Sequence, residues 1–268
     1  MQRYPKRIIA LYSAFNEILV SIGAKDLLVA RTAQDSLQDI ASLPAIGTHM
    51  RPNLELIAAY KPDLVIQLQG RTDAQLQTQA LRDLGLTVLE FPLNSFTDMW
   101  HVTKIFGLLT QHQTQAYSAI LSWQKRLNEI EARHIGQTTH TVVFEVRSPD
   151  LLVAGANNIC SEIIKISGGK NVVTTAKKLV HINEEAILKL NPDVYIIQTG
   201  PMNPSPLPLA QRPTLKMLKA AQNGRSLLVR EDMFSRPGPM AIDACDQLER
   251  WLYAESRAKN TTPQKTLP

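Results

Sequence analysis

Residues 55–67, ELIAAYKPDLVIQ, and residues 185–198, EAILKLNPDVYIIQ, share one pattern that decides the expected fold. Each begins with a glutamate and a short helix-forming stretch, passes through a Pro-Asp pair and ends in an apolar run of strand length. The two glutamates and the two Pro-Asp pairs are each 130 positions apart. Residues 16–25, NEILVSIGAK, also match residues 161–170, SEIIKISGGK. Two matches in the same order predict two related lobes.

A helical segment separates the two copies. Residues 95–134 carry apolar side chains at helical spacing and contain no proline, and Gly107 is their only glycine. The polar residues 111–114, QHQT, leave two alternatives open: one long helix, or a short helix followed by a longer one from about Thr114. The predicted domains are an amino-terminal α/β lobe over 1–95, a connecting helix over 96–136 and a carboxyl-terminal α/β lobe with a polar tail over 137–268.

Both lobes read as strands alternating with helices, which is typical of a parallel sheet. Residues 64–66 and 194–197 are apolar without alternation, as a strand covered on both faces requires. Asn53 and Asn183 stand where each following helix begins, and we expect their side chains to cap those helices. The pattern therefore predicts the α/β class in both lobes.

Composition limits the function classes. The 268 residues carry a net charge of +5 with 44% hydrophobic and 20% charged residues, and no apolar run approaches the length of a membrane span. The basic residues are scattered and lack interleaved aromatics, so we expect no nucleic-acid partner. Cys160 and Cys245 form no CxxC motif and are expected to be buried thiols, with a disulfide as the alternative. Residues 1–10 contain no signal peptide, so either the protein is cytoplasmic or a leader has been removed.

The sequence contains no motif of a common enzyme class. We find no G-x-G-x-x-G after a strand, no P-loop, no G-x-S-x-G and no H-E-x-x-H, and the histidines show no metal-ligand pairing. The sequence therefore predicts no catalytic residue, no metal site and no cofactor. An enzyme with two α/β lobes remains the alternative class, because fold alone excludes no function.

Several segments in fixed order resemble one protein family. They are residues 52–57 and 61–66, residues 144–146 with 152–155, residues 163–172 and residues 236–239. Over about residues 7–252 the chain resembles the helical-backbone class (class III) of substrate-binding proteins, which serve ATP-driven importers of ferric siderophores, haem and vitamin B12. The resemblance implies two Rossmann-like lobes with parallel sheets, joined by a single long helix, with the ligand in the cleft between the lobes. It also implies a monomeric periplasmic protein or cell-surface lipoprotein that delivers its ligand to an ABC permease.

The same resemblance suggests where the permease would dock. Family members usually place one carboxylate on the rim of each lobe, where it meets an arginine of the permease. Asp73 lies near the expected position in the first lobe. In the second lobe Ser235 stands where related proteins often have glutamate, and Glu231 and Asp232 are the nearest substitutes.

Ligands of parallel α/β lobes bind beyond the carboxyl ends of the strands, so the loops there supply the candidate site. These candidates are Tyr12, His49, Arg51, Arg71, Arg147, Met202, Met233, Phe234 and Arg236. The arginines are expected to pair with an anionic ligand, since guanidinium groups bind carboxylate and catecholate oxygens. Tyr12, Met233 and Phe234 are expected to form an apolar wall. Tyr12 and His49 are each either a ligand contact or an ordinary packing or loop residue.

The predicted ligand is an anionic small molecule, and an iron siderophore or a related metal chelate fits the mixture of charge and apolar wall. Haem fits if Tyr12 or His49 reaches the iron, because both residue types serve as axial ligands. A corrinoid such as vitamin B12 is less favoured, since aromatic residues make up only 6% of the chain. An oxyanion such as molybdate or tungstate is a further alternative.

Overall fold

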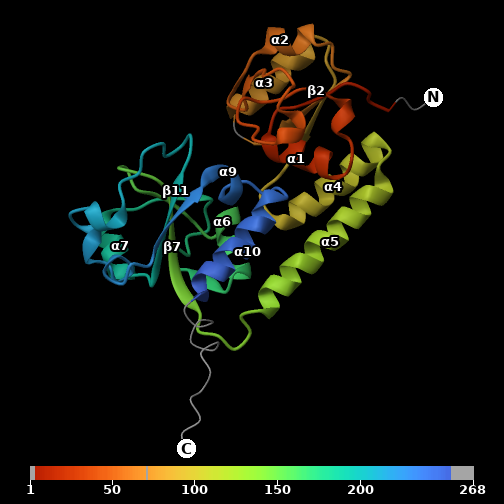
Figure 1. Ribbon diagram of the computed structural model, residues 1–268. Coiled ribbons are helices and arrows are strands. Elements are labelled where there is room, and N and C mark those ends of the chain that lie inside the picture. Colours follow the sequence, from red (N-terminus) through yellow and green to blue (C-terminus); the bar gives the residue numbers. More distant parts are fainter. Residues whose placement is uncertain (1–3, 71, 255–268) are drawn as a thin grey trace, which may run out of the picture. The chain divides into compact units, whose positions relative to one another are not determined.

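The computed structural model describes residues 4–70 and 72–254, except for the side chains of residues 72 and 73, and contains two compact units (Figure 1). Unit 1 contains the residues up to Gln124 together with Pro237–Pro239. Unit 2 contains Lys125–Arg236 and the residues from Met240 onward. Each unit has a sheet and a hydrophobic core of its own.

Unit 1 is built on a four-stranded parallel sheet. Its strands are β1 (Ile8–Ala10), β2 (Leu28–Ala30), β5 (Leu64–Leu68) and β6 (Val88–Phe91), in the order β2-β1-β5-β6. The other strands and α-helices described before residue 95 are α1 (Ser13–Ser21), the pair β3 (Gly47–Thr48) and β4 (Arg51–Pro52), α2 (Leu54–Ala59) and α3 (Thr72–Asp83). Ile9 and Val65 are fully buried from solvent in the core, which explains why these strands lack polar alternation.

Two helices, α4 (Phe96–Thr110) and α5 (Gln113–Ala132), follow the first sheet. Gln111 takes a left-handed conformation with φ of 61°, and this ends α4. The connection is therefore not a single helix over 96–136, and the alternative with a break is confirmed. A Cβ on Gly107 would lie 2.6 Å from the Cβ of Ala116, so the glycine permits the two helices to approach closely. The division between the units falls within α5, after Gln124.

Unit 2 contains a six-stranded mixed sheet. Its strands are β7 (His140–Arg147), β8 (Leu152–Ala154), β9 (Gly169–Asn171), β10 (Leu179–His181), β11 (Val194–Thr199) and β12 (Ser226–Arg230). The order is β10-β8-β7-β11-β12, and β9 also pairs with β7. Its helices are α6 (Ile159–Ile166), α7 (Glu184–Leu190), α8 (Lys219–Gln222), α9 (Glu231–Phe234) and α10 (Met240–Leu252).

The second sheet departs from the predicted parallel arrangement in one place. Strands β7, β9, β11 and β12 are parallel, whereas β8 is antiparallel to β7 and β10 is antiparallel to β8. Only residues 148–151 join β7 to β8, and so short a connection permits only an antiparallel pair. The prediction of a wholly parallel second sheet is corrected accordingly.

The repeated Pro-Asp pairs have the same role in both units. Asp63 immediately precedes the central strand β5, and its carboxylate accepts hydrogen bonds from the backbone N–H groups of Lys6 (2.8 Å) and Arg7 (2.9 Å), next to β1. Asp193 immediately precedes β11, and its carboxylate accepts bonds from the backbone N–H (2.9 Å) and the hydroxyl (2.7 Å) of Thr141 in β7. Each aspartate thereby fixes the start of one strand against its neighbour.

The predicted helix caps are also confirmed. The Asn53 side chain accepts a hydrogen bond of 2.9 Å from the backbone N–H of Leu56 at the start of α2. The Asn183 side chain accepts one of 2.8 Å from the backbone N–H of Ala186 at the start of α7. The internal repeat is thus a repeat of capping and strand-pairing contacts as well as of sequence.

A buried ion pair fixes the proline-rich loop over residues 201–208 of unit 2. Arg212 donates to both carboxylate oxygens of Glu145, and the Tyr195 hydroxyl donates to the same carboxylate at 2.7 Å. The Arg212 and Glu145 side chains are 7% and 0% exposed. Burial and the nearby carboxylate raise the pKa of Tyr195 well above its usual value, so this hydroxyl remains a donor. Arg212 also donates to the carbonyl of Leu207 at 3.0 Å, which holds the loop against the sheet.

We predict that Arg212→Ala lowers the free energy of unfolding of unit 2 by about 3–5 kcal/mol, because it leaves the Glu145 carboxylate buried without its partner. Urea denaturation measures the loss. The matched control is Arg230→Ala, which removes an ion pair to Asp232 from a side chain that is 62% exposed and should cost about 1 kcal/mol or less. Equal losses in the two variants would contradict a special role for the buried pair.

The pH dependence of stability tests the role of Asp193. Burial alone would raise the pKa of its carboxyl, but hydrogen bonds from Lys219 and Thr141 outweigh it and lower the pKa to about 2. The contribution of the Asp193 carboxylate to the stability of the folded state is therefore complete above the unfolded pKa near 4, and it is lost as the pH falls toward 2. We expect Asp193→Asn to reduce stability at pH 7 by about 2 kcal/mol and to lose less than wild type between pH 4 and 2. Exposed Asp26→Asn is the control, and parallel pH curves for wild type and Asp193→Asn would refute the assignment.

Candidate functional site

In unit 1 the structure brings together two of the predicted site residues. Tyr12 immediately precedes α1 at the carboxyl end of β1, and His49 lies in the turn between β3 and β4. Their ring centroids are 5.7 Å apart at an interplanar angle of 71°, an edge-to-face contact. Tyr12 makes a similar contact with Phe15, which is fully buried in the core. The Tyr12 ring thus connects the core of unit 1 to the His49 turn.

A polar network joins the loop after β2 to α1, next to Tyr12, and the sequence analysis did not identify it. One carboxylate oxygen of Asp35 accepts bonds from the Thr32 backbone N–H (2.6 Å), the Thr32 hydroxyl (2.9 Å) and the Asn16 amide (3.0 Å). The Ser13 hydroxyl lies 3.3 Å from the Thr32 hydroxyl. The network fixes the loop after β2 against the first turn of α1. Its sequence signal is Thr32 followed three residues later by Asp35, a spacing that favours such local hydrogen bonds.

The structure describes the other candidates in unit 1 to different extents. Arg51 is exposed, and its guanidinium has no hydrogen-bond or ion-pair partner among residues 4–70 and 72–254. Met50 beside it is 39% exposed. Arg71 lies outside the described residues, and Asp73 is placed only as backbone within α3.

In unit 2, Arg147 is already paired. At the carboxyl end of β7 its guanidinium donates two hydrogen bonds to Asp150, at 3.0 and 2.6 Å, in a bidentate ion pair. The Arg147 and Asp150 side chains are 39% and 57% exposed. An anion that binds Arg147 must therefore displace or share the carboxylate of Asp150.

Both carboxylates predicted to dock the permease in unit 2 have partners within that unit. Glu231 accepts a hydrogen bond of 2.8 Å from the backbone N–H of Met202. Gly200 has a φ of 157°, and a Cβ there would lie 2.5 Å from the Cβ of Glu231, so this glycine makes room for the contact. Asp232 forms a bidentate ion pair with Arg230, with bonds of 3.0 and 2.5 Å. Their docking role stays a prediction.

Phe234 does not form an apolar wall as predicted. It is 1% exposed, and its ring stacks on Phe144 of β7 with centroids 6.3 Å apart. The Phe234 ring belongs to the core because α9 packs it against β7, in the central part of the sheet. Met202 is 38% exposed, Met233 is half-buried, and Arg236 is 8% exposed. The two methionines therefore remain the apolar candidates of this unit.

A second polar network, also missed from sequence, lies at the carboxyl end of β11. The Ser235 hydroxyl donates to the Gln198 side chain, and the Asn203 amide donates to the Gln198 carbonyl at 2.9 Å. The Asn203 side-chain oxygen accepts from the Ser148 backbone N–H and lies 3.3 Å from it. These bonds connect the loops after β7 and β11 to the segment after α9, so the candidate loops of unit 2 are fixed to one another.

Both cysteines are free and buried, which confirms the prediction of buried thiols. Burial raises the pKa of Cys160 to about 12 and that of Cys245 still further. Such thiols do not act as nucleophiles at neutral pH. Within residues 4–70 and 72–254 no group of three His, Cys, Asp or Glu side chains converges to hold a metal ion.

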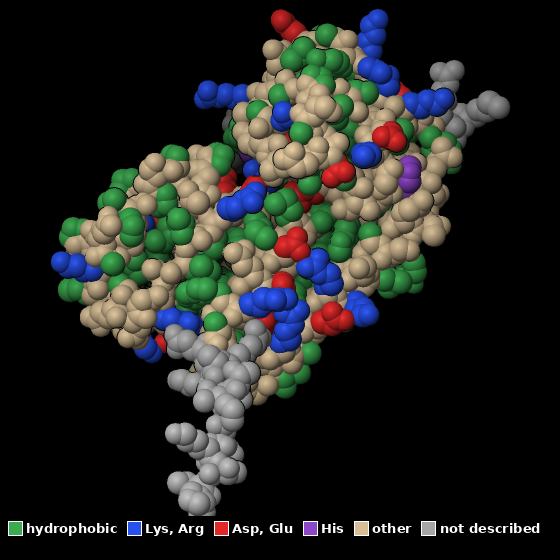
Figure 2. All heavy atoms as spheres, in the orientation of Figure 1, with side chains coloured by type: hydrophobic (Ala, Val, Ile, Leu, Met, Phe, Trp, Pro, Cys, Tyr) green, Lys and Arg blue, Asp and Glu red, His purple; other side chains and the backbone are tan. Residues whose placement is uncertain are grey.

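Charges of both signs are interspersed on the helices of unit 2. Arg126 pairs with Asp243, and Arg133 and Arg250 pair with Asp246, which joins the second half of α5 to α10. Over these elements Figure 2 shows basic and acidic side chains side by side. None of the described helices is both long and apolar enough to cross a membrane.

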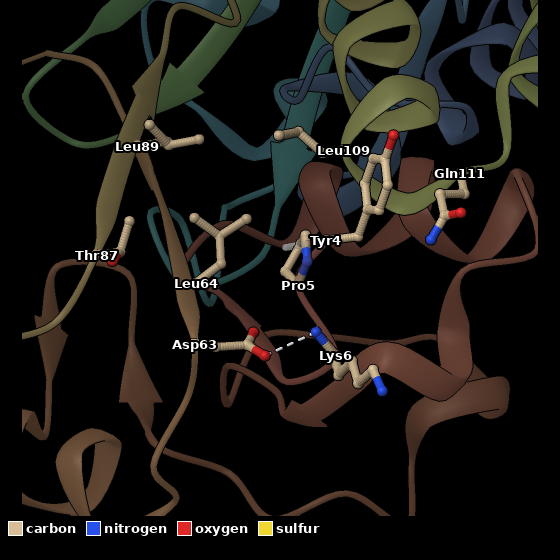
Figure 3. A pocket seen from close by; sticks show the side chains of 9 residues that line it. All are labelled: Tyr4, Pro5, Lys6, Asp63, Leu64, Thr87, Leu89, Leu109 and Gln111. Atoms are coloured by element: carbon tan, nitrogen blue, oxygen red, sulfur yellow. Dashed lines mark hydrogen bonds between the residues drawn. The ribbon is translucent and has the colours of Figure 1, made fainter. Parts of the chain in front are cut away.

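A cavity of about 890 Å³ lies in unit 1, away from the candidate loops. It opens at the amino ends of β1, β5 and β6, whereas the candidate residues follow the carboxyl ends (Figure 3). Ligands of parallel α/β sheets bind at the carboxyl ends. The cavity is therefore separate from the predicted ligand site.

Comparisons with known proteins agree with this architecture. The chain is 26% identical over 263 residues to an uncharacterized ABC transporter substrate-binding lipoprotein, YvrC, of Bacillus subtilis, which covers 96% of this chain and 82% of the relative. It is 22% identical over 251 residues to a vitamin B12-binding protein of Yersinia pestis, covering 91% and 85%. A periplasmic heme-binding protein from Pseudomonas aeruginosa has the same fold, with a TM-score of 0.81, 22% identity and 93% of each chain covered.

These similarities confirm two predictions from the sequence. The fold class is that of the solved periplasmic binding proteins, and the similar proteins are named for binding and transport, not for catalysis. The family model described as periplasmic binding protein matches residues 8–232, which is most of the chain. The chain therefore belongs to the periplasmic binding protein family.

Proposed function

We propose that this chain is the substrate-binding component of an ABC importer and that its ligand is an organic metal chelate. Family membership supports the importer role, as does the similarity to a substrate-binding lipoprotein. Two of the similar proteins are named for vitamin B12 and heme, which are both metal complexes of large organic macrocycles. The importer role implies export of the chain and delivery of the chelate to a membrane permease.

The single observation that carries the ligand proposal is the contact between Tyr12 and His49. The Tyr12 phenol follows the carboxyl end of β1 and is 9% exposed, and the His49 imidazole lies against its ring from the turn between β3 and β4. Both side chains are of the types that ligate haem iron. A bare oxyanion requires only hydrogen-bond donors and would leave this aromatic pair unused. We therefore place a haem-type macrocycle first.

An anionic ferric siderophore is the second candidate, and Arg51 favours it. This guanidinium is exposed and unpaired within the described part of the chain, so it is available to a carboxylate or catecholate oxygen. The siderophore ranks second because Arg147 was expected to contribute another positive charge, and Asp150 neutralises that charge. We further propose that the protein has no nucleic-acid partner, because its helices intersperse acidic with basic side chains, and that it acts as a monomer, as the family resemblance implies.

Titration with hemin tests the first candidate. We expect hemin to bind at one per chain with a shifted absorption band, and Tyr12→Phe or His49→Ala to weaken binding at least tenfold, since tenfold corresponds to about 1.4 kcal/mol. Tyr117→Phe is the control, because Tyr117 is 61% exposed on α5. Tight binding of molybdate, with no binding of hemin, cyanocobalamin or a ferric siderophore, would overturn the chelate proposal.

A pair of substitutions tests the role of Arg147 with an anionic ferric siderophore as ligand. Asp150→Asn removes the competing carboxylate, so we expect calorimetry to show severalfold tighter binding. Arg147→Ala should weaken binding tenfold to a hundredfold, as expected for the loss of a charge-assisted pair worth about 1.5 to 3 kcal/mol. Asp26→Asn controls for the change in net charge. If Asp150→Asn and Arg147→Ala both bind as wild type does, Arg147 contacts no ligand.

A further inference from the structure

The turn that carries His49 belongs to a very short hairpin. Strands β3 and β4 contain two residues each, and Pro52 in β4 has no backbone N–H to donate. A hairpin of this size is not stable by itself. Its base is joined to the rest of unit 1, because the Gly47 carbonyl accepts a hydrogen bond of 2.8 Å from the Ala33 N–H. Its tip, with His49 and Met50, therefore depends on contacts from other elements.

Two glutamine side chains supply one such contact. The Gln77 amide on α3 donates to the backbone carbonyl of Met50 at 2.8 Å. The side-chain oxygen of Gln77 accepts a bond of 3.3 Å from the Gln67 amide on β5. The side-chain oxygen of Gln67 in turn accepts a bond of 3.0 Å from the backbone N–H of Leu68. A chain of three hydrogen bonds thus runs from the central strand of the sheet to the tip of the turn.

The two ends of this chain fix the direction of both side-chain amides. A backbone N–H only donates, so the side-chain oxygen of Gln67 must face Leu68. A carbonyl only accepts, so the side-chain nitrogen of Gln77 must face Met50. The groups that then meet between the two glutamines are a donor on Gln67 and an acceptor on Gln77, which are complementary. Neither amide can turn over without losing its bonds on both sides.

Burial makes Gln67 a firm anchor for this chain. Its side chain is 2% exposed, whereas Gln77 is half-buried and Met50 is 39% exposed. A buried amide that moves leaves polar groups unpaired away from water, which is unfavourable. The hydrogen bonds therefore connect the exposed tip of the turn to a side chain held in the interior of unit 1.

We propose that Gln67 and Gln77 are positioning residues of the ligand site, which hold the turn so that the His49 ring stays against Tyr12. This inference rests on the proposed function, because that function assigns ligand contact to Tyr12 and His49. The ring contact joins the turn to the end of β1, and the Gln77 bond joins the adjacent residue, Met50, to α3. The two contacts fix neighbouring residues of one turn from different elements, so loss of the Gln77 bond releases the His49 ring from its place.

Nuclear magnetic resonance on the ligand-free full chain tests the positioning directly. The ring current of Tyr12 displaces the signals of the His49 ring protons, and the His49 signal is the one that is missing from His49→Ala. We expect this signal to move in Gln77→Ala and in Gln77→Glu at pH 7, because neither side chain can donate to the Met50 carbonyl. Glutamate keeps the size and the acceptor oxygen of glutamine, so the second variant isolates the loss of the donor.

Two variants on the same helix are the matched controls. Gln79→Ala removes an amide that bonds only to Asp83 within α3, at 2.8 Å, and Gln75→Glu adds the same charge at an exposed position. Both should leave the His49 signal where it is in wild type. An unmoved signal in both Gln77 variants, or an equal movement in the controls, overturns the proposal.

Substitution of Gln67 tests whether the glutamines act in series. Gln67→Ala removes a side chain whose hydrogen-bond path to the turn passes through Gln77, and we expect it to move the His49 signal in the same direction as Gln77→Ala does. The double variant should move the signal no further than Gln77→Ala alone. If circular dichroism shows that Gln67→Ala is unfolded, Gln67→Asn replaces it, because the shorter side chain keeps an amide but cannot reach both neighbours. Additive movements, or no movement in a folded Gln67 variant, contradict the chain.

Hemin titration connects the positioning to the ligand site. We expect Gln77→Ala and Gln77→Glu to bind hemin severalfold to tenfold more weakly than wild type, and the two controls to bind it equally well. A moved His49 signal with unchanged hemin affinity shows that the glutamines do not serve the site and overturns the proposal. The proposed function fails separately, if wild type binds neither hemin, cyanocobalamin nor a ferric siderophore, and the resonance measurement then still decides whether the glutamines position the turn.

Discussion

Hydrogen bonds to the carboxylate of one aspartate, just before the central strand, hold each sheet in register. Asp63 and Asp193 each follow a proline, which cannot continue the preceding helix, and each bonds to the strand beside it. Because the strands are parallel, fixing their amino ends also fixes where their carboxyl ends emerge. The loops that hold Tyr12 in unit 1 and Arg147 in unit 2 depend on this alignment.

Local patterns therefore predicted much of the fold. The Asn53 and Asn183 caps, the buried strands β5 and β11 and the break near Gln111 all depend on neighbouring residues, so their signals are in the sequence. The antiparallel β10 was missed because residues 179–181 are few and mostly exposed. Nothing in so short a stretch separates a strand from a loop.

The candidate site was harder to predict because its contacts join residues far apart in the chain. Strand ends identified the candidate loops, and two of the residues chosen there, Tyr12 and His49, do lie together. The sequence did not reveal that Phe234 packs on Phe144, because an aromatic residue in a loop looks the same whether buried or exposed. Nor did it reveal the pairing of Arg147 with Asp150, since an arginine three residues before an aspartate is common on solvated surfaces.

The burial of both cysteines has a practical consequence for studying transport. Thiol-reactive dyes require a thiolate, and burial raises the pKa of Cys160 to about 12 while both thiols are enclosed by the core of unit 2. A cysteine introduced at an exposed position is therefore labelled selectively without removal of the native pair. Two such positions, one in each unit, would report by fluorescence energy transfer how the protein responds when it captures and releases its cargo.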